Sequence, residues 1–123
     1  MPGTGLPSVL GMTTPTPAPL DLTPIRATVR RALQEHPRPP RNSEVRQITA
    51  ELRGHLQRMV REAQRRADGI ERGTEAWIRW SALIMRAEDD LYRVGEVGTH
   101  AAATRMNDLG RTCRRLADCL DEW

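Results

Sequence analysis

The sequence contains no phenylalanine and no lysine, and it has only two cysteines. All 19 of its basic residues are arginine, a bias that a GC-rich genome explains as readily as a functional requirement. The cysteines, Cys113 and Cys119, lie six residues apart on one predicted helix, too far along its axis to bridge each other. Because no CxxC or Cys/His spacing typical of zinc is present, we predict two free thiols in a reducing compartment.

Long apolar runs are also missing. No segment reaches the roughly 18 apolar residues that a membrane-spanning helix needs. The N-terminus lacks the charged segment and the compact apolar segment of a secretory signal. These absences predict a cytoplasmic protein with no membrane partner.

No segment alternates apolar and polar residues with the period of two that marks a strand. Helical periodicity is found instead, and 123 residues suffice for one domain. The prediction is an all-α fold over residues 23–123, in which three long helices form a small antiparallel bundle and a short N-terminal helix packs across them. Residues 1–22 are rich in proline and threonine, and we predict a disordered tail there.

Two of the predicted helices come before the middle of the chain. Thr23 is the predicted N-cap and Pro24 the predicted first residue of a short helix that continues to about His36. The longest helix runs from Ser43 to Arg66, and its apolar residues recur every three or four positions. These residues are Val45, Ile48, Leu52, Leu56, Met59 and Ala63.

Two further helices follow. Thr74 is the predicted cap of a helix from Glu75 to about Val94, whose wide apolar face predicts the most enclosed helix of the fold. Thr99 opens the last helix, with a stripe typical of lengthwise packing. The residues of that stripe are Ala102, Met106, Leu109, Cys113, Leu116, Leu120 and Trp123.

Gly54 interrupts the longest helix at a cost of roughly 1 kcal/mol relative to alanine. It projects opposite the apolar stripe, near Ala50. The sequence therefore predicts either a close approach on this side or a tolerated exposed glycine. A homodimer could form through the Ala50/Gly54 side or through the stripe of the last helix.

Glu88 is the sharpest candidate for chemistry, because it falls inside the apolar arc of its helix. A carboxylate in such a place is either paired or shifted in pKa. Arg53 and His55 flank the stripe of the longest helix, and we predict that one of them holds Glu88 across the helix interface. The pair would fix helix register or, alternatively, serve a small enzyme. Glu51-x-x-x-His55 differs from the Glu-x-x-His pairing of di-iron bundles and has no second copy, so neither a metal nor a cofactor is predicted.

Arg58, Arg61 and Arg65 cluster on the outer face of the longest helix. With a net charge of +3, the chain could dock the phosphates of a nucleic acid there. Glu62 lies among these arginines and no exposed aromatic residue is near, which favours a solvated face.

Four short patterns resemble a family of small actinobacterial proteins of unknown function that is described as natural product biosynthesis proteins. The similarity covers roughly Thr23 to Trp123. The patterns are Ile25-Arg26-x-Thr28-x-x-Arg31-Ala32-Leu33, Leu52-Arg53-Gly54-His55-Leu56, Arg86-Ala87-Glu88 before Leu91, and Leu116-Ala117-x-x-Leu120. The resemblance implies a setting in a secondary-metabolite pathway and assigns no catalytic residue.

The resulting prediction is a non-catalytic helical accessory protein that acts on another protein through a helix face. A regulatory module that binds nucleic acid through the Arg58, Arg61 and Arg65 face is one alternative. A small enzyme that uses Glu88 and His55 is the other.

Overall fold

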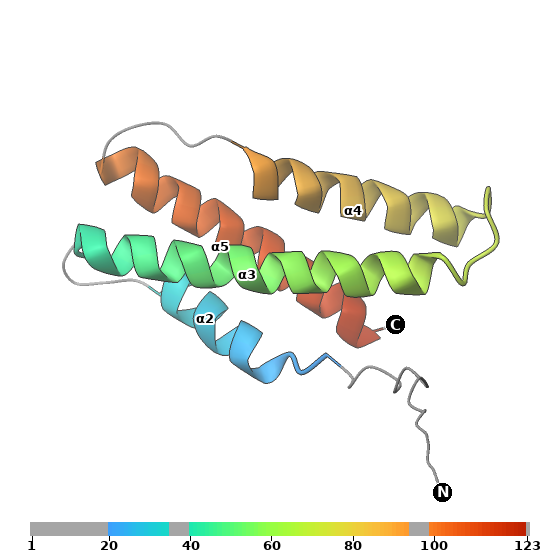
Figure 1. Ribbon diagram of the computed structural model, residues 1–123, viewed down its shortest axis with the longest axis horizontal. Coiled ribbons are helices and arrows are strands. Elements are labelled where there is room, and N and C mark those ends of the chain that lie inside the picture. The colour runs from blue at the N-terminus through green and yellow to red at the C-terminus, as the bar shows by residue number, and fades with distance from the viewer. Residues whose placement is uncertain (1–19, 35–39, 94–98, 123) are drawn as a thin grey trace, which may run out of the picture.

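The computed structural model describes residues 20–34, 40–93 and 99–122, which form four helices and no strand. Consecutive helices run in alternating directions (Figure 1). The prediction of an all-α bundle is confirmed. The helices are α2 (Thr23–Leu33), α3 (Asn42–Ala67), α4 (Glu75–Tyr92) and α5 (Thr99–Glu122).

The helices are arranged in layers. α3 and α5 contact each other in the middle, α2 packs on one side of them and α4 on the other, and α2 does not contact α4 (Figure 1). Amphipathic helices bury one stripe each, and α3 and α5 supply most of the core. The largest fully buried side chains are Ile25, Leu52, Leu56, Met59, Leu91, Leu109, Leu116 and Cys113.

The predicted stripes of the two longest helices are confirmed in the part of the chain that the structure describes. All six stripe residues of α3 are buried, and so are those of α5 from Met106 to Leu120, while Ala102 is partly buried. Trp123 lies outside the described residues. No described helix is long and apolar enough to cross a membrane.

The start and the end of α2 differ from the prediction. Thr23 is the first helical residue, and its N–H donates to Asp21 Oδ1 at 3.0 Å, so Asp21 supplies the bond expected of a cap. The helix ends at Leu33, and the predicted extension to His36 falls in 35–39, outside the described residues. Leu20 and Leu22 pack against the core, and residues 1–19 of the predicted tail lie outside the described residues.

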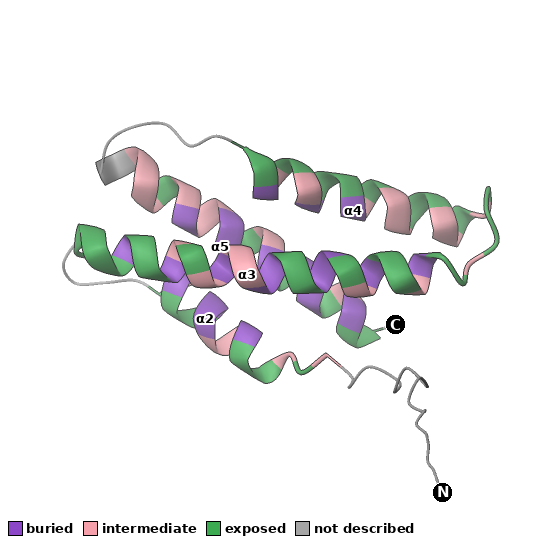
Figure 2. Cartoon of the chain, in the orientation of Figure 1, coloured by how far each residue is buried: buried purple, intermediate pink, exposed green. Residues whose placement is uncertain are grey.

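α4 is not the most enclosed helix, and that prediction is wrong. Only Ile84, Ala87 and Leu91 are buried on it (Figure 2). α4 forms an outer layer, so only one side of its wide apolar face meets α3 and α5. Its predicted cap is confirmed, because Thr74 Oγ1 accepts a hydrogen bond from the Trp77 N–H at 3.2 Å.

Candidate functional site

His55 and Glu88, the polar residues predicted to meet, lie on different sides of α3. His55 is buried, and its Nε2 lies 3.0 Å from Thr28 Oγ1 on α2. Glu88 belongs to α4, which packs on the side of the bundle opposite α2. Within the described ranges Glu88 is half-buried and has neither a hydrogen-bond partner nor an ion-pair partner. The predicted pairing of Glu88 with His55 is therefore wrong, and the small enzyme loses its geometric basis.

Arg53 does not hold Glu88 either. Its charge acts on Arg105 of α5, since burial lowers the pKa of the Arg105 guanidinium and Arg53 lowers it further. Arg105 Nη2 donates to the carbonyl oxygens of Asp90 at 2.6 Å and of Arg93 at 2.8 Å. Carbonyls in the last turn of a helix lack intrahelical donors. Arg105 therefore caps the C-terminal end of α4 and ties it to α5.

His55 is part of a polar network between α2 and α3. Arg58 Nη2 bonds to His55 Nδ1, and a guanidinium can only donate, so Nδ1 is the unprotonated nitrogen. Nε2 then carries the hydrogen and donates to Thr28 Oγ1. The Thr28 hydroxyl lies 3.1 Å from the Pro24 carbonyl oxygen and 3.4 Å from Glu51 Oε1, either of which can accept its hydrogen.

The charges around His55 favour its neutral form. Burial lowers the pKa of His55, the neighbouring Arg58 lowers it further, and Glu51 opposes the shift. Arg31 Nη1 in turn pairs with Glu51 Oε1 at 3.1 Å. Since both ring nitrogens are already hydrogen-bonded, the arrangement orders α2 against α3 and offers no free base to a substrate.

The predicted basic face of α3 is exposed, and two of its three arginines are engaged by neighbouring side chains. Arg58, Arg61 and Arg65 are all exposed. Arg65 donates twice to Glu62, at 3.0 Å and 2.5 Å, and Arg66 donates to it at 2.7 Å. These bonds, those from Arg65 above all, lower the pKa of Glu62 to about 2. Arg58 bonds to His55, so only Arg61 lacks a partner among the described residues of this face.

Gly54 does not pack closely against the described part of the chain. A methyl group at its Cα would meet nothing within 4 Å, and the neighbouring Ala50 is exposed. The close contact is made by Gly110 on α5, where a Cβ would lie 3.2 Å from Ala32 Cβ and 3.1 Å from Leu33 Cδ2. Gly110 is thus the glycine that lets α2 approach α5.

The outer face of α4 carries three large apolar side chains, two of which, Ile78 and Met85, belong to the wide apolar face that was predicted to be enclosed. Ile78 is 56% exposed, Met85 65% and Tyr92 68%. They lie seven residues apart, so at about 100° per residue they form one narrow stripe along the helix. Ala82 is also exposed and lies beside it, and the exposed carboxylate of Asp89 lies on the same side of the helix. We call this the α4 outer stripe, defined as Ile78, Ala82, Met85 and Tyr92.

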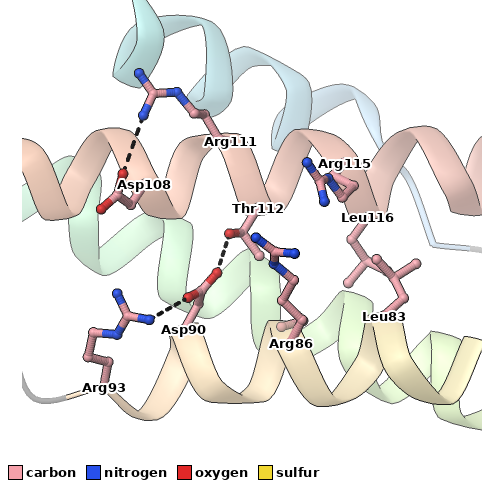
Figure 3. Close-up of a pocket in the computed structure, with 10 residues that line it drawn as sticks. Leu83, Arg86, Asp90, Arg93, Asp108, Arg111, Thr112, Arg115 and Leu116 are labelled. Atoms are coloured by element: carbon pink, nitrogen blue, oxygen red, sulfur yellow. Dashed lines mark hydrogen bonds and ion pairs between the residues drawn. The ribbon is translucent and has the colours of Figure 1, made fainter.

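A polar pocket of about 260 Å³ lies between α4 and α5 (Figure 3). Asp90 accepts a hydrogen bond from Thr112 Oγ1 at 2.5 Å and pairs with Arg93 at 3.4 Å. Arg86 extends from α4 towards α5 (Figure 3), and it has no carboxylate partner among the described residues. The sequence did not predict this pocket, because its lining joins two helices whose relative rotation no local pattern specifies.

Neither cysteine is placed for reactivity. Cys113 is fully buried, burial raises the pKa of its thiol to about 12, and its Sγ lies 3.6 Å from the Leu52 carbonyl oxygen. Burial also raises the pKa of Cys119, which is half-buried. The described residues contain no group of three or more His, Cys, Asp or Glu that could hold a metal ion.

Comparison with known proteins identifies a family whose function is unknown. The family of unknown function DUF6415 matches residues 23–123. No curated protein and no solved structure matches the chain.

Proposed function

The chain belongs to the family of unknown function DUF6415, and on that premise we propose that it is a non-catalytic interaction protein that binds a protein partner through the α4 outer stripe. We propose a cytoplasmic setting in natural product biosynthesis, which is supported by the sequence resemblance.

The observation that carries this proposal is the exposure of Ile78, Met85 and Tyr92 on one line of α4. Apolar surface that is contiguous and exposed is a common mark of a protein interface. Fully burying one such side chain contributes about 1.5–3 kcal/mol, and these three are more than half exposed. Covering the stripe would therefore contribute a favourable free energy of several kcal/mol, which offsets part of the cost of association.

The two other functions have less support. Nucleic acid would need free arginines, and on the α3 face Arg58 and Arg65 are engaged by His55 and Glu62. Catalysis by Glu88 and His55 would need them in one site, and they lie on different sides of α3.

Site-specific photo-crosslinking tests the proposal. A benzophenone amino acid replaces Ile78 on α4 in one variant and Gln57, exposed on α3, in a control. Both are irradiated in nuclease-treated extract of the native host. We expect a protein adduct from position 78 and none from position 57. Met85→Asp, introduced beside the probe, should abolish the adduct because it places a charge in the stripe.

Three results would contradict the proposal. Adducts that form equally at both positions would mean that the stripe is not selective. Adducts that survive Met85→Asp would mean that the contact lies elsewhere. In a third variant the probe replaces Arg61, and a nucleic-acid adduct there, obtained without nuclease and in place of a protein adduct at position 78, would favour the regulatory alternative.

A further inference from the structure

We propose that the pocket between α4 and α5 binds a small phosphate monoester, with its phosphate group between Arg86 and Arg115 and its carbon body against the apolar residues beside them. The pocket shares no residue with the α4 outer stripe, so this site does not depend on the proposed function. Three features of the pocket support this ligand: the position of the two arginines, the charges around them and the apolar part of the lining.

The first feature is that Arg86 and Arg115 lie at nearly the same level on two neighbouring helices. α4 and α5 run in opposite directions (Figure 1), and the hydrogen bond between Asp90 and Thr112 fixes their register. Arg86 lies four residues before Asp90, and Leu116 lies four residues after Thr112, so these two positions are level with each other. Arg115 is therefore about 1.5 Å from the level of Arg86 along the helix direction. Both side chains line the pocket (Figure 3), and one oxyanion between the helices can contact both guanidinium groups.

The second feature is that the charges of these two arginines are not neutralised. Neither has a hydrogen-bond or ion-pair partner among the residues that the structure describes. The other two arginines of the pocket are paired, Arg93 with Asp90 at 3.4 Å and Arg111 with Asp108 at 3.3 Å. With four arginines and two aspartates, the lining carries an excess of two positive charges. That excess lies at Arg86 and Arg115.

Asp89 is the carboxylate that would compete for Arg86, because side chains three residues apart on a helix can pair. It is exposed, and no ion pair joins it to Arg86 in the structure. Ion pairs between exposed side chains are weak, whereas an anion held by two guanidinium groups gains charge-assisted hydrogen bonds from both. The pocket anion is therefore the stronger partner for Arg86.

The geometry and charge of the two guanidinium groups select the class of anion. A guanidinium holds its N–H donors in a planar fork that matches the oxygens of a phosphate or a carboxylate. A carboxylate has one negative charge and two oxygens, whereas a phosphate monoester at pH 7 has a charge of about −1.5 to −2 and three free oxygens. Two unpaired guanidinium groups are therefore better matched by the phosphate monoester.

The third feature is the apolar part of the lining. Ala87 and Leu116 are buried, and Leu83 is half-buried. The exposed part of Leu83 and the aliphatic stems of Arg86 and Arg115 form a surface that a carbon body would cover and that inorganic phosphate would leave in water. The volume of about 260 Å³ is below the range of about 300–1,000 Å³ found for drug-sized ligands, so the carbon body is small, of the size of a single ring.

Isothermal titration calorimetry of the full chain tests the site with three probes, which are phenyl phosphate, inorganic phosphate and benzoate. An ionic strength of about 0.15 M screens charges that lie more than about 8 Å from the ligand. We expect phenyl phosphate to bind saturably, with one molecule per chain. Its Kd should be about tenfold lower than that of inorganic phosphate, because the ring covers apolar surface, and about tenfold lower than that of benzoate, which has a single charge.

Substitutions then connect binding to the two arginines. Arg86→Gln and Arg115→Gln should each raise the Kd of phenyl phosphate about tenfold, since each removes a charged donor from the site. Arg114→Gln is the matched control, because Arg114 is exposed on the same helix and does not line the pocket. It removes the same charge from the chain and should change the Kd by less than about twofold. Asp89→Asn should not raise the Kd, and circular dichroism verifies that every variant is folded.

Four results would overturn the proposal or a part of it. Phenyl phosphate that does not bind saturably would overturn the site. An equal rise of the Kd in Arg114→Gln would show that the anion is attracted by the net charge of the chain and not by this pocket. Equal Kd values for phenyl phosphate and inorganic phosphate would overturn the carbon body, and benzoate that binds as tightly as phenyl phosphate would overturn the choice of a phosphate.

Discussion

Replacing Gly54 by alanine should stabilise the fold, whereas the same change at Gly110 should not. Both glycines lie inside helices, where glycine costs about 0.5–1 kcal/mol relative to alanine. At Gly54 the new methyl group meets nothing within 4 Å. Gly54→Ala should therefore raise the free energy of unfolding by about 0.5–1 kcal/mol, equivalent to about 2–8 °C in Tm for a domain of this size.

At Gly110 the helix gains the same preference but the space is filled. The Leu33 side chain is half-buried and can turn aside, but Ala32 Cβ moves only if α2 moves. Overpacking of this kind costs about 1–3 kcal/mol, which exceeds the gain. We expect Gly110→Ala to lower the free energy of unfolding by about 1 kcal/mol.

Urea unfolding followed by far-UV circular dichroism measures both values, with an unchanged m value as the sign of a simple stability change. Equal effects of the two substitutions would refute the reasoning, because the two sites would then be equally open. A loss of stability in Gly54→Ala at high protein concentration only would instead indicate another molecule against the Ala50/Gly54 side.

Four further measurements follow from the polar groups and the thiols. The pKa of His55 in the folded protein is below its ordinary value near 6.5, so its contribution to the free energy of unfolding should be complete above pH 6.5. Below that pH the free energy of unfolding should fall by at most about 1.4 kcal/mol per pH unit. His55→Gln should remove this slope when urea unfolding is measured as a function of pH. Glu62 should add a second loss as the pH falls from about 4.5 towards its pKa of about 2, which Glu62→Gln would abolish. Arg105→Gln should cost about 1–2 kcal/mol through the uncapped end of α4, and an unchanged unfolding midpoint would contradict that cap. A thiol reagent at pH 8 should label Cys119 slowly and Cys113 only after denaturation, and rapid labelling of two thiols in the native protein would contradict the burial of Cys113.

The stripes of α3 and α5 were predictable because each helix has one apolar side and one polar side, so its buried side is marked in the sequence itself. α4 is apolar over most of its circumference, and its sequence does not say which part meets the core. Its surplus apolar residues, Ile78, Met85 and Tyr92, became the candidate interface only once the neighbours of α4 were known.

The predicted pairing of Glu88 with a residue of α3 is wrong for a related reason. Periodicity gives the angle of a residue on its own helix but not the neighbour that the angle faces, and His55 faces α2. The tight glycine was within reach of sequence reasoning, because Gly110 lies between Met106 and Cys113 on the predicted stripe of the last helix. Gly54 departs from the pattern of its helix but lies away from the buried stripe, whereas close packing between helices requires small residues on that stripe.

The absence of contact between α2 and α4 makes the two sides of the molecule independent reporters. The pKa of His55 depends on whether α2 is docked on α3, and the exposure of the α4 outer stripe depends on whether a partner is bound. A substitution that only disrupts the interface should therefore leave the titration of the imidazole resonances unchanged, whereas one that unfolds the bundle should return the pKa of His55 towards its ordinary value. One nuclear magnetic resonance titration thus separates loss of binding from loss of fold for every variant of α4.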